Sequence, residues 1–240
     1  MTISMSLGIE KLVTIRGDYM SQPLSILRPP KPDPRWLEPF LSYCHTKGYD
    51  KNVDLIRVGE PAESLYYLVD GSVAAVIDDE DRRELLLAYI NKGEFIGEMG
   101  LFVPQNTRSV IIRTRCKCRV AEITYQRLDR LLDNELKDVA KDFLYAVGYQ
   151  LSQRLRQTSR KVGHLAFLDV TGRIAGTLLD LCKQPDAMTH PDGMQIRVTR
   201  QEIGRIVGCS REMAGRVLKN LEEQGLISVK GKTIVVFGTR

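Results

Sequence analysis

The chain has 240 residues, and 35 Lys and Arg against 30 Asp and Glu give it a formal net charge of +5. This length is enough for one large domain or two modest ones with substantial hydrophobic cores. No apolar run approaches the roughly 18 to 20 residues of a membrane helix, which excludes an integral membrane protein. The charge is too small to indicate nucleic acid binding by itself.

The cysteines and the first residues point to a cytoplasmic protein. Five cysteines are spread widely along the chain. An odd number, in a chain too long to need disulfides for stability, is typical of reduced thiols. The N-terminus also lacks the basic stretch, apolar core and cleavage site of a secretory signal. We therefore expect a cytoplasmic location.

Proline marks the first boundary in the chain. Six of the ten prolines fall between residues 23 and 39. The run PPKPDP cannot continue a helix and favours the polyproline II conformation. The sequence therefore predicts a flexible, proline-rich extension over residues 1–35.

The residue pattern over 36–134 is typical of a β-domain. Short apolar runs recur in SLYYLVDGSVAAVI, ELLLAYI, SVIIRT and RVAEITY, separated by glycines and the acidic turn DDEDR. Many short strands with turn signals between them predict an antiparallel barrel or roll. Cys116 and Cys118 flank Lys117 on one expected strand, and we predict buried thiols there instead of a metal site.

A long helix is predicted over residues 135–163. Six of its residues are spaced 4, 3, 4, 3, 4, like the a and d positions of a coiled coil: Leu144, Gly148, Leu151, Leu155, Thr158 and Val162. Two interpretations remain open, a dimerisation helix and a helix packed on its own β-domain. Polar Thr158, flanked by Arg154 and Ser159, is unusual for a plain core and favours an interface.

The C-terminal part, residues 164–240, predicts a winged helix-turn-helix. LDVTGRIAGTLLDLC is a helix with Asp169 or Thr171 as N-cap, and a loop from Lys183 to Gly193 and a strand MQIRV follow. Helix TRQEIGRIVG, a turn at Gly208–Cys209 and helix SREMAGRVLKNLEE have the helix-turn-helix layout. The segment LISVKGKTIVVF is a hairpin wing that turns at Gly231.

Positive charge is concentrated on this motif. The 23 residues from Arg197 to Lys219 hold six cations and two acids, a local balance of +4. Arg211, Glu212 and Arg216 share one face at the start of the second helix, where they could reach base edges in a major groove. The alternative is a solvated face on which Glu212 pairs with Arg216. The candidate DNA-binding residues are Thr199, Arg200, Gln201, Ser210, Arg211, Glu212, Arg216 and Lys219.

A second constellation is FIGEMGLF followed by TRS. Clustered glycines let backbone N–H groups approach an anion, and the guanidinium of Arg108 suits a phosphate. Glu98 could accept a hydrogen bond from a sugar hydroxyl. Taken alone, a Glu ten residues before an Arg is equally explained by a buried salt bridge.

The C-terminal motifs, with LAFLDVTGRIA before them, resemble the cAMP receptor protein (catabolite activator) family of the Crp/Fnr superfamily. The resemblance runs from roughly Phe40 to Arg240 and is near-verbatim from Val162 onward. It implies an α+β fold in which a cyclic-nucleotide-binding β-roll and a dimerisation helix precede the winged helix-turn-helix. It also implies a homodimeric transcription regulator that binds pseudo-palindromic double-stranded DNA and touches RNA polymerase through the loop Lys183 to Gly193.

The resemblance also implies a set of ligand contacts. Gly97, Glu98, Arg108 and Ser109 match the family's phosphate-binding cassette. Arg154, Thr158 and Ser159 fall where the family reads the base of cAMP, with Thr158 acting in its own subunit and Ser159 reaching the ligand of the partner.

Three alternatives to a cAMP-responsive regulator remain. The longer segment ELKDVAKDF and the strand VIIRTR resemble plant-pathogen relatives that respond to cyclic di-GMP, although Ser109 and the Thr158–Ser159 pair fit cAMP better. The others are a ligand-independent DNA binder and a cyclic-nucleotide module without a DNA role. No nucleophile–base pair, P-loop or cysteine cluster appears, so we expect neither an enzyme nor a metal, iron–sulfur or haem protein.

Overall fold

The computed structural model describes residues 9, 12–13, 34–78, 84–103 and 106–239. The fold is α+β, and the chain divides into two compact units, residues 24–158 and residues 1–23 with 159–240. None of the helices described is long and apolar enough to cross a membrane.

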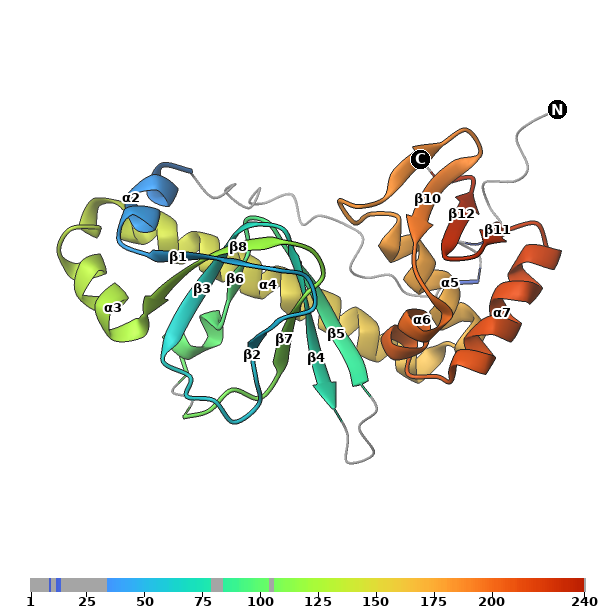
Figure 1. Ribbon diagram of the computed structural model, residues 1–240, viewed down its shortest axis with the longest axis horizontal. Helices are drawn as coiled ribbons and strands as arrows, with labels where there is room; N and C mark the ends of the chain where they lie inside the picture. The colour runs from blue at the N-terminus through green and yellow to red at the C-terminus, as the bar shows by residue number, and fades with distance from the viewer. Residues whose placement is uncertain (1–8, 10–11, 14–33, 79–83, 104–105, 240) are drawn as a thin grey trace. The chain divides into compact units, whose positions relative to one another are not determined.

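The first unit is built on two antiparallel four-stranded sheets with the strand orders β1-β8-β3-β6 and β2-β7-β4-β5 (Figure 1). The strands are β1 (His45–Tyr49), β2 (Asp54–Ile56), β3 (Ser64–Asp70), β4 (Ser72–Asp78), β5 (Glu84–Asn91), β6 (Phe95–Ile96), β7 (Ile111–Thr114) and β8 (Cys118–Thr124). Its short helical elements are η1 (Pro34–Trp36), α2 (Leu37–Ser42), η2 (Glu98–Leu101) and α3 (Tyr125–Asp133).

Short helices flank the strands of the β-domain at both ends. Helix α2 contributes Phe40 to the core, and α3 contributes Leu128 and Leu131. Helix α3 begins where the Thr124 side chain caps it by accepting a hydrogen bond from the Arg127 N–H.

An aromatic cluster fills the core of the first unit. Trp36, Phe40, Tyr67, Phe95 and Phe143 are each buried. Trp36 stacks on Phe95 with ring centroids 5.5 Å apart, and Phe40 lies 5.2 Å from Phe143. Because Phe143 comes from the long helix, this cluster fixes that helix against the sheet that contains β6.

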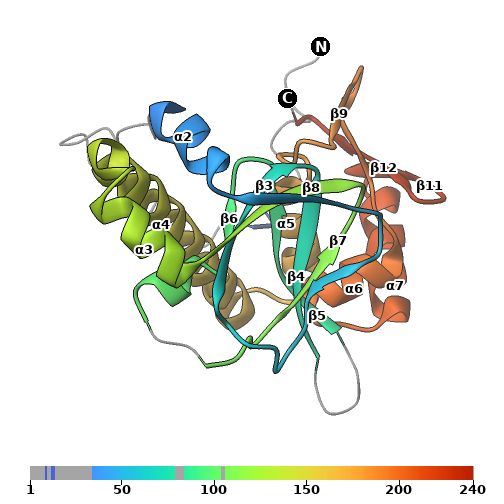
Figure 2. The same ribbon diagram turned by 60° about the vertical axis from the view of Figure 1, so that its left-hand side comes forward.

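The long helix α4 (Lys137–Phe167) begins in the first unit and ends in the second. Its buried face carries Phe143, Ala146, Val147 and Gln150. Of the 4–3 stripe, Leu144 is 43% exposed, Leu155 69% and Val162 59%, whereas Leu151 is partly buried and packs against the core of the first unit. The helix therefore packs on its own β-domain through its buried face and Leu151, and it leaves Leu144, Leu155 and Val162 uncovered. Figure 2 shows α4 running past the strands.

The second unit is a helical group with a four-stranded sheet of order β11-β12-β10-β9. Its elements are α5 (Val170–Leu181), β9 (Met188–His190), β10 (Gly193–Arg197), α6 (Arg200–Val207), α7 (Arg211–Glu223), β11 (Ile227–Lys230) and β12 (Thr233–Phe237). Of the two N-caps considered for α5, Asp169 is the cap, because its side chain accepts from the Gly172 N–H. The predicted loop Lys183 to Gly193 contains the short strand β9.

Two further expectations differ from the structure. Strand β8 begins only at Cys118, which is buried, so Cys116 lies before the strand and is exposed. Of the extension expected to be flexible, Ile9 is 3% exposed, and most of the rest lies outside the described residues. No group of three or more His, Cys, Asp or Glu that could hold a metal ion is found in the described part of the chain.

Candidate ligand and nucleic-acid sites

Gly97 shapes the turn between β6 and η2. Its φ of 82° lies in the left-handed region, and a Cβ there would stand 2.6 Å from Nη1 of Arg108. Only glycine meets both conditions without strain. The Tyr125 hydroxyl donates to the Gly97 carbonyl over 2.6 Å, which holds the turn in place. The glycine therefore lets the backbone and a guanidinium come close together.

Arg108 is a buried cation held by neutral groups. It is 7% exposed, donates from Nη2 to the Ser64 carbonyl at 2.5 Å, and donates from Nη1 to the Tyr125 hydroxyl at 3.2 Å. Its guanidinium carbon lies 5.7 Å from the centre of the Tyr66 ring. No carboxylate of the described residues comes within ion-pair distance of it. Buried charges are normally paired, so this guanidinium is a place where an anion would be stabilised.

Glu98 pairs with the long helix and not with Arg108. It is 3% exposed, and Nη1 of Arg154 forms a short charge-assisted contact with its Oε1. Nη2 of Arg154 donates to the Phe95 carbonyl at 2.7 Å and lies 4.0 Å from Glu94. The alternative of a Glu98–Arg108 salt bridge is therefore wrong. Instead, Arg154 joins α4 to the turn that carries Gly97.

The remaining three candidates are exposed. Ser109 follows Arg108 directly, and Thr158 lies one helical turn beyond Arg154 on the same face of α4. Ser159 is exposed on α4 and belongs to the second unit. The structure thus brings Gly97, Glu98, Arg108 and Arg154 together, and the side chains of the three hydroxyl residues form no hydrogen bond with these four.

Sequence reasoning missed the groups that hold this site. Ser64, Tyr66 and Tyr125 lie far from Arg108 in the chain, and no spacing relates them to it. Gln150 offered a signal, because it is a polar residue on the face of α4 that Phe143, Ala146 and Val147 bury. Its Oε1 accepts from the Phe95 N–H at 2.7 Å, and its Nε2 donates to the Phe95 carbonyl at 3.0 Å.

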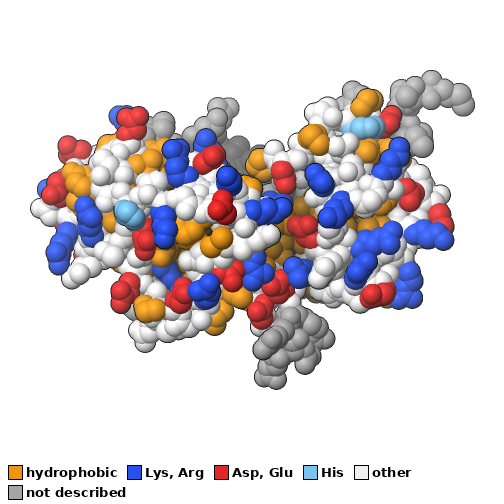
Figure 3. Space-filling view, viewed as in Figure 1, with side chains coloured by type: hydrophobic (Ala, Val, Ile, Leu, Met, Phe, Trp, Pro, Cys, Tyr) orange, Lys and Arg blue, Asp and Glu red, His pale blue; other side chains and the backbone are white. Residues whose placement is uncertain are grey.

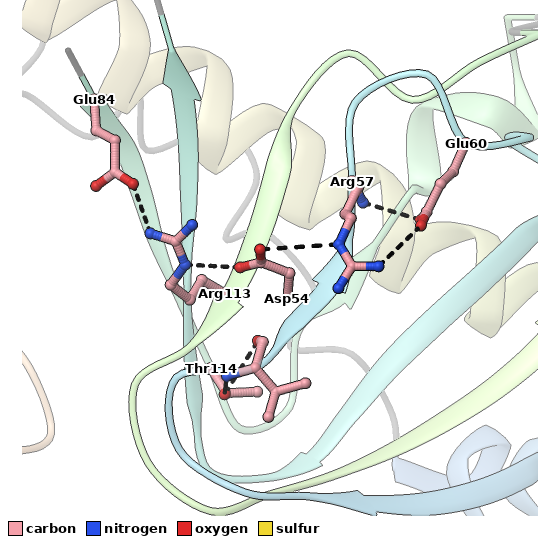
Figure 4. A network of polar contacts seen from close by, with 7 residues as sticks. Asp54, Arg57, Glu60, Glu84, Arg113 and Thr114 are labelled. Atoms are coloured by element: carbon pink, nitrogen blue, oxygen red, sulfur yellow. Dashed lines mark hydrogen bonds and ion pairs between the residues drawn. The ribbon is translucent and has the colours of Figure 1, made fainter. Parts of the chain in front are cut away.

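The arginines of the segment VIIRTR take part in internal contacts, and Figure 4 shows those of Arg113. Arg113 donates from Nε to Asp54 at 2.7 Å and from Nη1 to Glu84 at 2.6 Å, and these hydrogen bonds raise its pKa. Arg115 lies 3.8 Å above the ring of Tyr89. The feature that suggested cyclic di-GMP therefore has a structural explanation within the sheet.

The helix-turn-helix is defined by its caps and its turn. The Thr199 hydroxyl accepts from the Glu202 N–H and that of Ser210 accepts from the Met213 N–H, each at 3.1 Å. Gly208, with φ 72°, ends α6, and a Cβ on Gly204 would meet the Cys209 carbonyl at 2.6 Å. These positions fix where the two helices begin, where α6 ends, and how closely the turn approaches α6.

The first turns of α7 present an exposed polar face. Arg211, Glu212 and Arg216 are exposed, and the described residues contain no ion pair between Glu212 and Arg216. The Glu212 backbone N–H and the Ser210 hydroxyl lower the pKa of the Glu212 carboxyl. Lys219 is exposed and lies 3.7 Å from Glu223. Figure 3 shows Lys and Arg side chains gathered over this part of the chain. Of the other candidates, Arg200, Gln201 and Ser210 are exposed and Thr199 is partly buried.

Two family descriptions match the chain. Residues 46–135 match the cyclic nucleotide-binding domain, and residues 196–227 match the bacterial regulatory proteins of the crp family. The first contains the Gly97–Arg108 turn, and the second contains α6 and α7.

Similar proteins are known over most of the length. The cAMP-activated global transcriptional regulator CRP of Salmonella typhimurium is 57% identical over 215 residues, which are 90% of this chain and 100% of that protein. The cAMP-activated global transcriptional regulator Vfr of Pseudomonas aeruginosa is 55% identical over 212 residues, 87% of this chain and 97% of Vfr. The solved structure of the c-di-GMP responsive global regulator CLP of Xanthomonas campestris has a TM-score of 0.81 at 53% identity and covers 86% of this chain and 100% of that one.

Proposed function

The chain belongs to the crp family of bacterial regulatory proteins, and we propose that it is a cAMP-activated transcription regulator acting as a homodimer on double-stranded DNA. The observation that carries the ligand half of this proposal is the buried guanidinium of Arg108, which only neutral groups surround. A cyclic phosphate would supply the missing negative charge.

The other polar groups of cAMP would find partners around that guanidinium. In a 3′,5′-cyclic nucleotide the 2′-hydroxyl is the only free ribose hydroxyl, and Glu98 is the nearby carboxylate that can accept from it. Gly97 and Ser109 flank the phosphate position. Thr158 would contact the base in its own subunit, and Ser159 would contact it from the partner, while Arg154 orients Glu98.

The second half of the proposal is DNA recognition by a pair of α7 helices. The exposed residues of the α4 stripe, Leu144, Leu155 and Val162, give two copies an apolar surface to share. Two-fold symmetry then places the two α7 helices on half-sites about 34 to 36 Å apart. Arg211, Glu212 and Arg216 would read bases, while Thr199, Arg200, Gln201, Ser210 and Lys219 would contact phosphates or the groove edge.

Further parts of the proposal rest on family membership. The segment from Lys183 to Gly193, which includes β9, would touch RNA polymerase. The protein would act in the cytoplasm, where its DNA is, and would use no catalytic step.

Cyclic di-GMP is the second candidate ligand, because the solved structure at 53% identity is that of a c-di-GMP responsive regulator. Ser109 and the Thr158–Ser159 pair fit cAMP better. Arg113 and Arg115, the arginines that suggested the larger ligand, are engaged within their own sheet.

Calorimetry on the full-length protein with cAMP, cGMP and cyclic di-GMP side by side tests this choice. We expect cAMP to bind most tightly and to raise the affinity for operator DNA in a gel shift. Tighter binding of cyclic di-GMP would reassign the ligand. DNA binding of equal strength with and without each nucleotide would instead indicate a ligand-independent regulator, and no DNA binding at all would indicate a nucleotide module without a DNA role.

A further inference from the structure

Helix α5 carries two glycines that its own sequence does not explain. Gly172 and Gly176 are buried, four residues apart, on one face of the helix. A glycine inside a helix costs about 0.5 to 1 kcal/mol relative to alanine, so a pair of them usually marks a close approach by another part of the chain. The question is which segment approaches α5 at this face.

The segment that does so comes from the N-terminal end of the chain. A Cβ added to Gly172 would stand 3.0 Å from the Leu12 carbonyl oxygen, and one added to Gly176 would stand 3.4 Å from Cγ1 of Val13. Ile9, whose carbonyl accepts from the Leu12 N–H at 3.2 Å, is 3% exposed. These residues belong to the same compact unit as α5, and Figure 1 shows them as the short blue stretch beside it.

The contact falls at the corner where α4 turns into α5. Leu168 and Asp169 form this corner, and both lie within 3.4 Å of the Cβ position of Gly172. Arg173 donates from Nη1 to the Leu168 carbonyl at 3.1 Å, and His164 of α4 lies 3.4 Å from the Cβ position of Gly176. A segment packed here therefore touches both helices of the corner.

We propose that the glycine face of α5 is a docking site for the chain's own segment carrying Ile9, Leu12 and Val13, and that the docked segment stiffens the corner between α4 and α5. The segment contributes the apolar side chains of Ile9 and Val13. Its Leu12 carbonyl oxygen lies 3.0 Å from the Cβ position of Gly172, which is too close for an unstrained side chain there. The inference does not depend on which nucleotide the first unit binds.

The two glycines differ in a way that gives a sharp test. At Gly172 an added methyl group would stand 3.0 Å from a backbone oxygen, so the segment must shift by a few tenths of an ångström, whereas at Gly176 the nearest atoms are at 3.4 Å, an ordinary contact. Gly172→Ala should therefore lower the melting temperature of the full-length chain. Gly176→Ala is the matched control, and it should raise the melting temperature by about 1 to 4 °C through helix propensity alone.

The background variant Ile9→Asp removes the docked segment by placing a charge at its buried residue. In that background Gly172→Ala no longer meets Leu12, so its effect should change sign and resemble that of Gly176→Ala. Hydrogen exchange of the full-length Ile9→Asp protein should be several-fold faster in residues 164–176 and unchanged in residues 211–221 of α7. If Gly172→Ala stabilises both backgrounds equally, or if exchange at the corner is unaffected by Ile9→Asp, the docking site is wrong.

Discussion

At the scale of single residues, the site is organised by two arginines with opposite surroundings. Arg108 is buried among a carbonyl, a hydroxyl and an aromatic ring, and Arg154 is bound to Glu98 and near Glu94. The first can gain strongly from an anion, whereas the second is already neutralised. Both were identified from the sequence, but their partners were not, because Arg154 and Glu98 are 56 positions apart.

Replacing Arg108 tests the anion site directly. Arg108→Leu should lower the affinity for cAMP by about ten- to a hundredfold, because a charge-assisted hydrogen bond contributes about 1.5 to 3 kcal/mol. Calorimetry measures the affinity, and circular dichroism verifies the fold. Arg57→Leu, at an exposed arginine of the second sheet, should leave binding unchanged. Unaltered affinity in the Arg108 variant would place the ligand elsewhere.

Glu94 makes stability depend on pH. Burial raises its pKa above the ordinary value near 4.5, an effect that the Asn91 N–H and Arg154 only partly oppose. A carboxyl group with a raised folded-state pKa stabilises the fold fully below its unfolded pKa, and this stabilisation is lost as pH rises through the folded pKa. Glu94→Gln should therefore be more stable than wild type at pH 7, and the gain should vanish near pH 4.

Urea midpoints measured at both pH values test this effect. Exposed Glu63→Gln is the control and should show no such difference between the two conditions. A Glu94→Gln variant that is less stable than wild type at pH 7 would mean that the attraction to Arg154 outweighs burial.

At the scale of elements, local sequence signals could assign the caps and the turn of the helix-turn-helix. They could not assign the short helices at the two ends of the β-domain. Thr199, Ser210 and Gly208 act within a few residues of themselves, so caps and turn could be assigned from spacing. Helices α2 and α3 are held by contacts with distant strands and with α4, which no local pattern encodes. The anchoring of α4 through Gln150 could not be predicted from a local pattern either, because its partner, Phe95, lies on another element.

The Gln150 anchor should contribute measurably to stability. In Gln150→Leu the Phe95 carbonyl still receives the Arg154 hydrogen bond, but the Phe95 N–H is left without a partner. A buried donor left unpaired costs about 1 to 3 kcal/mol, which chemical denaturation would detect. Gln153→Leu, one turn away on a partly buried position, should change stability by less than about 0.5 kcal/mol. Equal losses in the two variants would contradict the anchor.

The exposed face of α7 predicts two different effects of substitutions on DNA binding. Arg211→Ala or Arg216→Ala should cost about 1 to 3 kcal/mol on the specific site and relax the preference at one base pair each. Lys219→Ala should weaken the binding of all DNA sequences alike and reduce the dependence of the affinity on salt concentration. Fluorescence anisotropy with operator and random duplexes at several salt concentrations separates these cases. An unchanged specific-to-random ratio in Arg211→Ala would contradict base reading by this residue.

At the scale of the whole molecule, α4 connects the two units in one continuous helix. The proposed base contacts, Thr158 and Ser159, are consecutive exposed residues of this helix. A ligand that bridges two subunits at this point binds one arrangement of the helix pair better than another, and it shifts the population accordingly. A change from 1:99 to 99:1 requires about 5.5 kcal/mol of differential affinity.

Ser159→Ala should therefore separate ligand binding from ligand response. The contacts of the β-roll remain, so affinity for cAMP should fall only slightly, while the stimulation of DNA binding by cAMP should fall much more. DNA anisotropy titrations with and without saturating cAMP measure this stimulation. Ser152→Ala, another exposed serine of α4, serves as the control. Parallel losses of ligand binding and stimulation would contradict a role for Ser159 in coupling.

The sheet of order β1-β8-β3-β6 ends in two strands that discourage further pairing. At one end, β1 is exposed and carries Lys47, a charge that resists the approach of another strand. At the other, β6 has two residues, and the Gln150 amide occupies both the N–H and the carbonyl of Phe95. A strand from another copy therefore meets a charged side chain at one border and an occupied backbone at the other, which disfavours strand-mediated aggregation and leaves the exposed residues of the α4 stripe as the surface through which copies can meet.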